Sequence, residues 1–142
     1  MGEDRPVDQA ATSRLSLRID LPNGSRLGPG KVNLLEAVNR CASISAAARD
    51  QGLSYRRAWL LIDDMNRAFR EPVVDTYPGR SQGKGATLTA FGKRLIALYR
   101  DAEAATADAI ACQVTQLESE VERAYDSLKA KPRRRRSDAG DA

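Results

Sequence analysis

Histidine is absent from this sequence of 142 residues. Its absence removes the commonest general base, the Ser–His and Cys–His nucleophile pairs, and most ligand sets for zinc and haem. The phosphate-binding patterns GxxxxGK[ST] and GxGxxG are absent as well. We therefore expect a protein that is not an enzyme and that carries neither a cofactor nor a metal ion.

Cysteine is scarce, and long apolar runs are missing. Cys41 and Cys112 lie far apart and form no CxxC pair, which favours a role as small apolar fillers in a reducing compartment over a disulfide framework. A redox role for either thiol stays open. No apolar run reaches 18 residues, and the first residues lack a basic stretch followed by an apolar one. We expect a cytoplasmic protein with no membrane partner.

The net charge of +4 is unevenly distributed along the chain. Residues 54–94 hold eight basic and four acidic residues, and residues 131–142 hold five basic and two acidic residues. The rest of the chain has a net negative charge. Positive charge gathered in a middle segment and a tail favours a polyanionic partner.

The first third of the chain changes pattern twice. Residues 1–13 are polar and aperiodic, which predicts a disordered arm. From residue 14 to 21, apolar and polar residues alternate strictly, as in a half-buried strand. Pro22–Ser25 forms a turn and Gly28–Gly30 a second break. An apolar stripe from Val32 to Ala42 then predicts a helix.

The middle of the chain predicts two more helices and a hairpin. Ser43 or Ser45 caps a short helix over 46–51, and Gly52 ends it. Ser54 caps a longer helix that Pro72 stops, with an inner stripe of Ala58, Ile62, Met65 and Phe69. Trp59, beside that stripe, is interpreted as partly core rather than base-stacking. The β-prone residues 73–77 and 86–88 flank a glycine-rich basic loop, which predicts a hairpin with its tip at 78–85.

A long amphipathic pattern follows Thr89, the predicted cap. Apolar residues recur at spacings of three and four from residue 90 to 130, which predicts one helix with a coiled-coil seam. Such a helix is about 60 Å long, so part of its stripe needs a second chain and a homodimer is expected. The predicted dimer residues are Leu98, Ile110, Val114, Leu117, Val121 and Leu128. Residues 131–142, with four consecutive arginines, are predicted to be a basic disordered tail.

Together these elements predict a mainly α fold with a small β component. It consists of a winged helix-turn-helix over 14–89 followed by a long C-terminal dimerisation helix. The third helix then lies in a major groove of double-stranded DNA with its N-terminal residues at base edges. The wing and the first turns of the last helix reach phosphates. The candidate DNA-binding residues are Ser43, Ser54, Tyr55, Arg56, Arg57, Leu60, Arg80, Lys84, Lys93 and Arg94.

Other interpretations stay open. The same module can serve as an adaptor that docks a partner protein, and an outward Leu60–Leu61 pair with a basic tail fits that use. Arg67 and Arg70 fit a solvated helix end, where they are favourable to the helix dipole. The arginine tetrad fits nonspecific attraction to a polyanion.

Several segments resemble the N-terminal DNA-binding domain of the ModE family of molybdate-responsive regulators. The similarity runs through Gly28–Val38, Ser43–Ala48, Leu53–Trp59 and Asp64–Asn66, and then through Gly79–Thr89 and Phe91–Ile96. It covers roughly residues 15 to 125. The Ser-Tyr-x-x-Ala-Trp stretch and the glycine-rich wing followed by Leu-Thr-x-x-Gly are its most specific parts. The helix-turn-helix alone is shared with the larger LysR-type group.

The resemblance implies a dimeric winged-helix regulator of transcription in which the helix after the wing holds the dimer together. It also suggests control of molybdenum-related genes. Full-length members of that family carry C-terminal molybdate-binding modules, whereas this sequence ends in a helix and an arginine tail. We therefore expect no direct molybdate sensing, and a separate effector-sensing protein is an expected partner. Leu60–Leu61 replaces a more polar pair, which makes the target sequence an open question.

Overall fold

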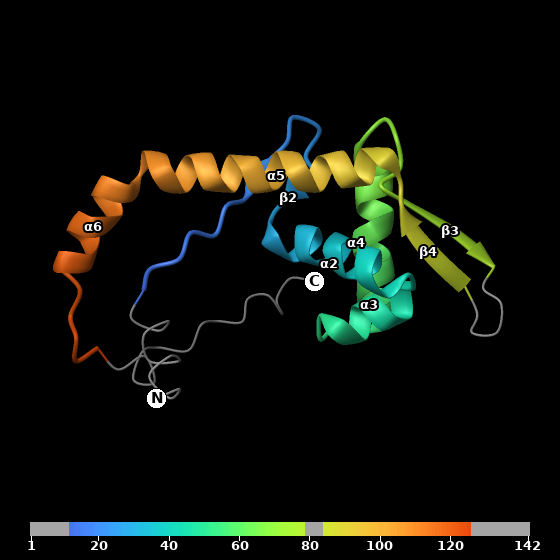
Figure 1. Ribbon diagram of the computed structural model, residues 1–142, viewed down its shortest axis with the longest axis horizontal. Helices are drawn as coiled ribbons and strands as arrows, with labels where there is room; N and C mark the ends of the chain where they lie inside the picture. Colours follow the sequence, from blue (N-terminus) through green and yellow to red (C-terminus); the bar gives the residue numbers. More distant parts are fainter. Residues whose placement is uncertain (1–11, 79–83, 126–142) are drawn as a thin grey trace. The chain divides into compact units, whose positions relative to one another are not determined.

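The computed structural model describes residues 12–78 and 84–125, and it divides the chain into two units, residues 1–110 and residues 111–142. The first unit has three helices, α2 (Pro29–Cys41), α3 (Ile44–Asp50) and α4 (Tyr55–Ala68), packed beneath the longer α5 (Ala90–Ala109) (Figure 1). Two antiparallel hairpins complete it: β1 (Ile19–Asp20) with β2 (Arg26–Leu27), and β3 (Val74–Pro78) with β4 (Lys84–Leu88). The mainly α fold with small β elements is confirmed.

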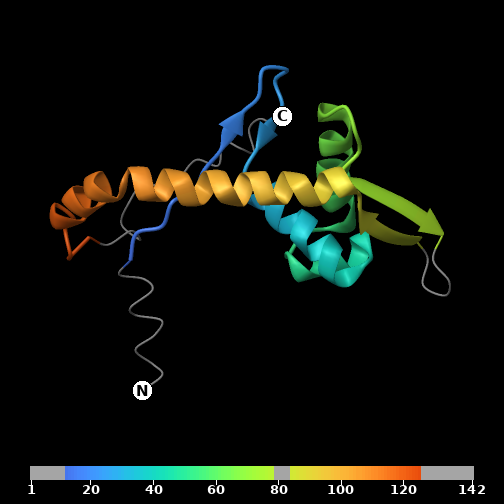
Figure 2. The same ribbon diagram turned by 45° about the horizontal axis from the view of Figure 1, so that its top comes forward.

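The first strand is much shorter than the sequence pattern predicts. The strand expected over 14–21 shrinks to β1, which pairs Ile19 with Leu27 and Asp20 with Arg26. The alternation of burial is nevertheless present, because the apolar residues from 15 to 21 are half-buried and the polar ones between them are exposed. The ladder cannot lengthen because β2 is followed almost at once by Pro29, which opens α2. Figure 2 shows this hairpin above α5 in the view.

The predicted helix caps are present. Ser43 Oγ accepts a hydrogen bond from the amide of Ala46, and Ser54 Oγ accepts one from the amide of Arg57 (3.1 and 3.0 Å). Gly52 has a φ of +70°, the left-handed conformation that lets the chain leave α3. The α2 helix begins at Pro29, three residues before the predicted start, because proline at the first helical position already has a helical φ.

The core of the first unit gathers apolar side chains from every helix of that unit and from β2, β3 and β4. Leu34 and Leu35 of α2, Met65 of α4 and Val73 before β3 are at most 1% exposed. Burial of each such side chain contributes about 1.5–3 kcal/mol. Ala47 and Ala48 of α3 are buried as well, and their small size lets α3 lie close to its neighbours.

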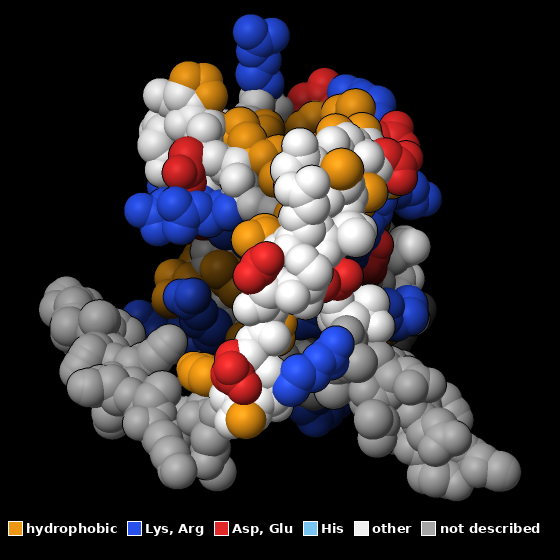
Figure 3. All heavy atoms as spheres, turned by 90° about the vertical axis from the view of Figure 1, so that its left-hand side faces the viewer, with side chains coloured by type: hydrophobic (Ala, Val, Ile, Leu, Met, Phe, Trp, Pro, Cys, Tyr) orange, Lys and Arg blue, Asp and Glu red, His pale blue; other side chains and the backbone are white. Residues whose placement is uncertain are grey.

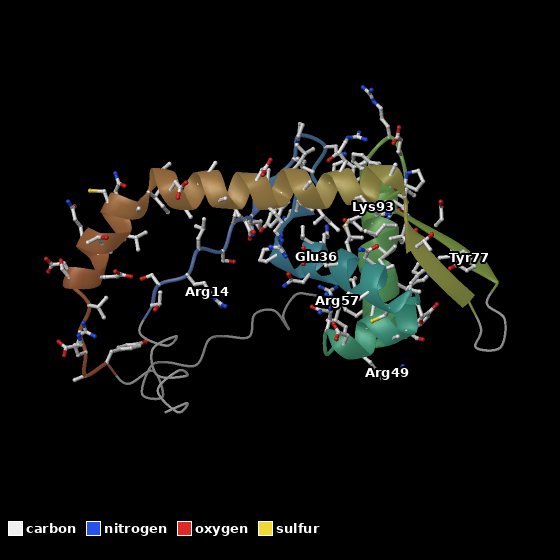
Figure 4. The ribbon with its side chains drawn as sticks, viewed as in Figure 1. Arg14, Glu36, Arg49, Arg57, Tyr77 and Lys93 are labelled. Carbon is white, nitrogen blue, oxygen red and sulfur yellow. The ribbon has the colours of Figure 1, made fainter. Side chains whose placement is uncertain are left out.

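A clamp of hydrogen bonds fastens α5 to α2. The Arg100 guanidinium donates to both oxygens of the Glu36 carboxylate (3.1 and 2.8 Å) and to Asn33 Oδ1 (2.8 Å). It also bonds Glu103 at 2.7 Å, and these carboxylates raise the pKa of Arg100. Figure 4 shows Glu36 on the side of α2 that faces α5. The register of α5 on α2 is therefore set by a charged contact as well as by packing.

Tyr99 makes a second attachment of α5. Its side chain is 1% exposed, and its hydroxyl donates to the carbonyl of Leu17 at 2.6 Å. Burial is the main reason that the pKa of Tyr99 is raised. This bond holds the extended segment before β1 where the predicted strand would have run.

The single helix predicted over 90–130 is two helices. In the first unit α5 ends at Ala109, and Ile110 takes a nonhelical conformation with φ −106° and ψ 9°. In the second unit α6 spans Ala111–Ser119 and buries none of its residues. Tyr99 is the last fully buried residue of α5, so the later turns have less of the tertiary packing on which most helical stability depends. Across the described residues, no helix is both long and apolar enough to cross a bilayer.

Candidate nucleic-acid interface

The turn between α3 and α4 fixes the start of α4. The amide of Leu53 bonds the carbonyl of Ala48 at 2.8 Å, and that of Gly52 bonds Arg49 at 3.1 Å. Leu53 packs against the core, and Ser54 then caps α4. Because the two backbone bonds and the Ser54 cap are local, the N-terminal turn of α4 has one defined orientation relative to α3.

Helical geometry gives α4 an inner and an outer face. Ala58, Ile62 and Met65 are at most 3% exposed and form the inner face. At about 100° per residue, the opposite face carries four residues, which we call the outer α4 face: Arg56, Leu60, Asp63 and Arg67. This assignment follows from the buried residues and the helical period together.

The outer α4 face combines a free cation, a paired cation and an apolar side chain. Leu60 is 40% exposed, as predicted. Asp63 and Arg67 form an ion pair of 3.0 Å one turn apart. Arg56 is exposed, and within the described part of the chain no acidic group pairs with its guanidinium. Arg56 therefore keeps its five donors for an external acceptor such as a guanine edge or a phosphate.

Arg57 does not belong to this face. It lies about 100° around the helix from Arg56 and lines a hollow together with Leu61 and the N-terminal residues of α2. Figure 4 shows Arg57 near α2. Leu61 packs partly against the core, so of the two leucines only Leu60 faces outward. Both arginines were predicted to bind DNA from the same part of α4, whereas the structure places Arg56 on the outer α4 face and Arg57 beside the start of α2.

The predicted serines cap helices in the fold, and the two aromatic residues of α4 are partly exposed. Ser43 and Ser54 both accept capping bonds, so an external acceptor can engage only their hydroxyl protons. Tyr55 is 51% exposed. Trp59 is 44% exposed, so its ring is covered in part, as the interpretation of a partly core residue expects, and it is not a fully buried core residue. It lies on the side of α4 between the buried stripe and solvent, where one flank of the ring stays open.

The β3–β4 hairpin, in the position of the predicted wing, is attached to α4 and to the α2–α3 corner. Asn66 Oδ1 accepts hydrogen bonds from the amides of Val73 and Val74 (2.7 and 3.3 Å). The amide of Ala86 bonds the carbonyl of Ala42 at 3.1 Å. The sequence analysis assigns no role to Asn66. Its position near the end of an amphipathic helix, just before a β-prone stretch, is the signal that could have indicated a side chain bonding the backbone of the next strand.

Close packing shapes the described part of this hairpin. Tyr77 is paired with Gly85, and a Cβ atom on Gly85 would lie 2.3 Å from Cε1 of the Tyr77 ring. Glycine is therefore required here for the tyrosine to lie across the strand. Lys84 begins β4 opposite Pro78, and Arg80 lies outside the described residues.

Lys93 and Arg94 are exposed in the first turn of α5, next to the base of the hairpin. Thr89 caps this helix: its hydroxyl accepts from the amide of Gly92 (2.9 Å) and donates to the carbonyl of Pro72 (2.7 Å). The Arg94 guanidinium lies 5.2 Å from the centre of the Phe91 ring. Figure 4 shows Lys93 at this end of α5 and Tyr77 on the hairpin.

The predicted dimer residues differ in exposure. Leu98 on α5 and Leu117 on α6 are 61% and 68% exposed, and Ile110 and Val114 are half-buried. Val121 is exposed beyond the end of α6, and Leu128 lies outside the described residues. Figure 3 shows hydrophobic side chains at the surface among charged ones. Such apolar groups gain by burial against another chain.

Comparison with protein-family models gives no match. Comparison with curated proteins does. The chain is 49% identical to the molybdenum-pterin-binding protein MopB of Rhodobacter capsulatus over 84 residues, which are 59% of this chain and 31% of that protein. It is 43% identical to the molybdenum transport protein ModE of Azotobacter vinelandii over 91 residues, 64% of this chain and 33% of that protein.

A third relative is named for its activity. The chain is 41% identical over 71 residues to the DNA-binding transcriptional dual regulator ModE of Escherichia coli, covering 50% of this chain and 27% of that protein. The matched stretches thus span about a third of the length of these relatives. They indicate a relation to the ModE and Mop proteins over this part, and they support a link to molybdenum and to transcription regulation.

Proposed function

We propose that this chain is a sequence-specific, DNA-binding regulator of transcription that acts on molybdenum-related genes. In this proposal residues 14–89 form a winged helix-turn-helix, α4 lies in the major groove, and the β3–β4 hairpin follows the adjacent backbone. The observation that carries the proposal is the outer α4 face, where Arg56 is exposed and free of acidic partners among the described residues. The similarity to a protein named as a DNA-binding regulator supports it.

The residues divide between affinity and specificity. Arg56 donates to a guanine edge and Leu60 contacts a thymine methyl group. Ser43, Ser54, Tyr55 and Arg57 contact the backbone near the start of α4, and Arg80, Lys84, Lys93 and Arg94 contact phosphates on the side of the hairpin. Phosphate contacts supply most of the affinity, which then falls steeply with salt.

The proposed molecule is a homodimer. The exposed apolar residues of α5 and α6, Leu98 and Leu117 among them, pack against a second copy. Two copies related by a two-fold axis read an inverted repeat whose half-sites are about one helical turn, ~34 Å, apart. A separate effector-sensing protein completes the regulatory circuit.

A second candidate function is an adaptor that docks a partner protein. Its support is the exposure of three large apolar residues on one helix: Tyr55, Trp59 and Leu60 are between 40% and 51% exposed. Aromatic residues of this kind are enriched at protein interfaces. The two functions differ in their salt dependence, because an apolar interface with a protein is much less sensitive to salt than phosphate binding.

The experiment that tests the proposal is selection from random genomic duplex fragments across a range of salt concentrations, with sequencing of what stays bound. Enrichment of an inverted repeat is the expected result. Retention without enrichment contradicts sequence specificity. No retention at low salt contradicts DNA binding and favours the adaptor.

A further inference from the structure

A basic hollow of about 440 Å³ lies in the first unit between the β1–β2 hairpin, the start of α2 and the first turns of α4. Its lining includes four cationic side chains, Arg18, Arg26, Lys31 and Arg57. The apolar part of the wall comes from Pro29, Leu53 and Leu61. None of the elements predicted to bind DNA contains Arg18, Arg26 or Lys31.

The four cations outnumber the carboxylates that pair with them. Lys31 lies 2.7 Å from Asp64. Arg18 and Arg26 share Asp20, at 3.1 and 3.8 Å. Within the described residues, Arg57 has no acidic partner. Two carboxylates against four cations leave a positive hollow, which attracts anions.

The backbone adds to this potential. Gly28 precedes α2 and supplies no side-chain cap. The amides of the first turn, at Gly30 and Lys31, have no acceptor within the helix, and a Cβ on Gly30 would meet nothing within 4 Å. The start of a helix carries partial positive charge, so it reinforces the four side chains.

The exposure of the two hairpin arginines indicates what kind of anion fits. The side chains of Arg18 and Arg26 are 59% and 67% exposed, so they stand at the rim and do not enclose a small ligand. Arg57 and the turn at Gln51 and Leu53 make the hollow continuous with the N-terminal end of α4. A chain of phosphates that passes the start of α4 can reach the same rim.

We propose that this hollow holds a backbone phosphate of the bound duplex, with Arg18, Arg26 and Arg57 as its donors. The inference rests on the proposed DNA-binding function and extends the protein's footprint to the first hairpin. Lys31, which is 16% exposed and bonded to both Asp64 and the carbonyl of Arg26, positions α2 against α4 at the floor of the site.

The test uses the full chain, a random-sequence duplex and a series of salt concentrations. Arg18→Gln and Arg26→Gln each remove one exposed cation outside α4 and outside the β3–β4 hairpin. Arg123→Gln, at an exposed position of the second unit, changes the net charge equally. We expect each hairpin variant to lower the slope of log affinity against log salt by about 0.9, the value for one lost phosphate contact, and the control to leave it unchanged.

The outcomes separate this inference from the function on which it rests. If the wild-type chain binds no duplex at low salt, the proposed function fails and the inference fails with it. If the wild-type chain binds but both hairpin variants keep the wild-type slope, the function stands and the inference is overturned.

A second arm distinguishes the source of the phosphate. Inorganic phosphate is titrated into the labelled protein while the amide signals of Gly28, Gly30 and Lys31 are followed by NMR. Two results together would contradict the proposal: saturable shifts of these amide signals on adding phosphate, and hairpin variants that bind duplex with the wild-type salt slope. They would assign the hollow to free phosphate. Equal thermal unfolding of the wild type and the variants confirms that the fold is intact.

Discussion

Two arginines of this chain, Arg100 on α5 and Arg56 on α4, have the same chemistry and opposite surroundings. Arg100 is half-buried and bonded to Glu36, Glu103 and Asn33. Arg56 is exposed, and no acidic group pairs with it in the part of the chain that the structure describes. In the α2–α5 contact the charge of Arg100 is paired with carboxylates. On the outer α4 face Arg67 is paired with Asp63, and Arg56 is not paired with an acidic group among the described residues.

The difference separates cations that hold the fold from cations that can bind a partner. Net charge alone cannot make this separation, because both arginines add equally to the +4 of the chain. A guanidinium already bonded to two carboxylates would have to lose those bonds before it bound a phosphate. We therefore expect stability and DNA affinity to depend on different sets of residues.

The largest expected effect is on dimerisation and duplex affinity, and it concerns the exposed apolar residues, which do not take part in the α2–α5 contact. Leu117→Asp places a charge at a 68% exposed apolar position of α6 and should convert the proposed dimer to a monomer in analytical ultracentrifugation. Loss of the linked second half-site should lower duplex affinity about 100-fold or more. Gln116→Asp, an exposed neighbour with the same added charge, should leave the dimer intact. A dimer that survives Leu117→Asp would move the interface elsewhere.

Arg100→Ala tests the other side of the comparison. It leaves Glu36 and Glu103 without their common partner and should lower the free energy of unfolding by about 2 kcal/mol, less than for a fully buried pair because solvent reaches the group. Urea unfolding measures this. Lys93→Ala, at an exposed position of the same helix, should stay within about 0.5 kcal/mol of wild type. Equal losses in both variants would show that the clamp adds no specific stability.

Tyr99→Phe sharpens the comparison with a smaller change in the same contact. It removes the hydroxyl that donates to Leu17 and should cost about 1 kcal/mol. Because the pKa of Tyr99 is raised in the folded chain, its contribution is complete below the unfolded pKa of about 10 and is lost as pH rises through the folded value. Stability measured from pH 8 to 11 should therefore decline less steeply in Tyr99→Phe than in wild type. Identical alkaline declines would contradict this role.

The smallest effect is expected at Arg67, which shares the outer α4 face with Arg56 but is already paired. Arg67→Gln breaks an exposed ion pair with Asp63 and should change stability by only about 0.3–0.5 kcal/mol. Its effect on duplex affinity in fluorescence anisotropy should be smaller than that of Arg56→Ala. A larger effect would mean that the ion pair with Asp63 leaves Arg67 as available to the duplex as Arg56 is.

Much of the helical region could be predicted because its signals are local. Ser43, Ser54 and Thr89 cap the helices that follow them, and Gly52 takes the left-handed conformation, as predicted. The inner stripe of α4 at Ala58, Ile62 and Met65 is also confirmed. Each of these features depends on a few neighbouring residues, so the sequence contains all of the information.

What could not be predicted depends on contacts between distant residues. The strand expected from 14 to 21 is short because α2 begins at Pro29, just after β2, and because Tyr99, 82 positions beyond Leu17, bonds the segment that precedes β1. The break at Ile110 reflects where packing ends and not a helix-breaking residue. Arg57 faces the start of α2 because burial of the inner stripe fixes how α4 is rotated about its axis. This rotation depends on contacts with other helices, so the adjacency of Arg56 and Arg57 in the sequence does not reveal it.

The central claim is that Arg56 is free of partners within the fold because it binds DNA. It is tested most directly by measuring Arg56→Ala and wild type side by side, both for affinity to the selected duplex and for urea unfolding. The account predicts a loss of about 1–3 kcal/mol in binding with relaxed preference at one base pair, and stability within about 0.5 kcal/mol of wild type. Unchanged affinity and unchanged base preference at this position would contradict it.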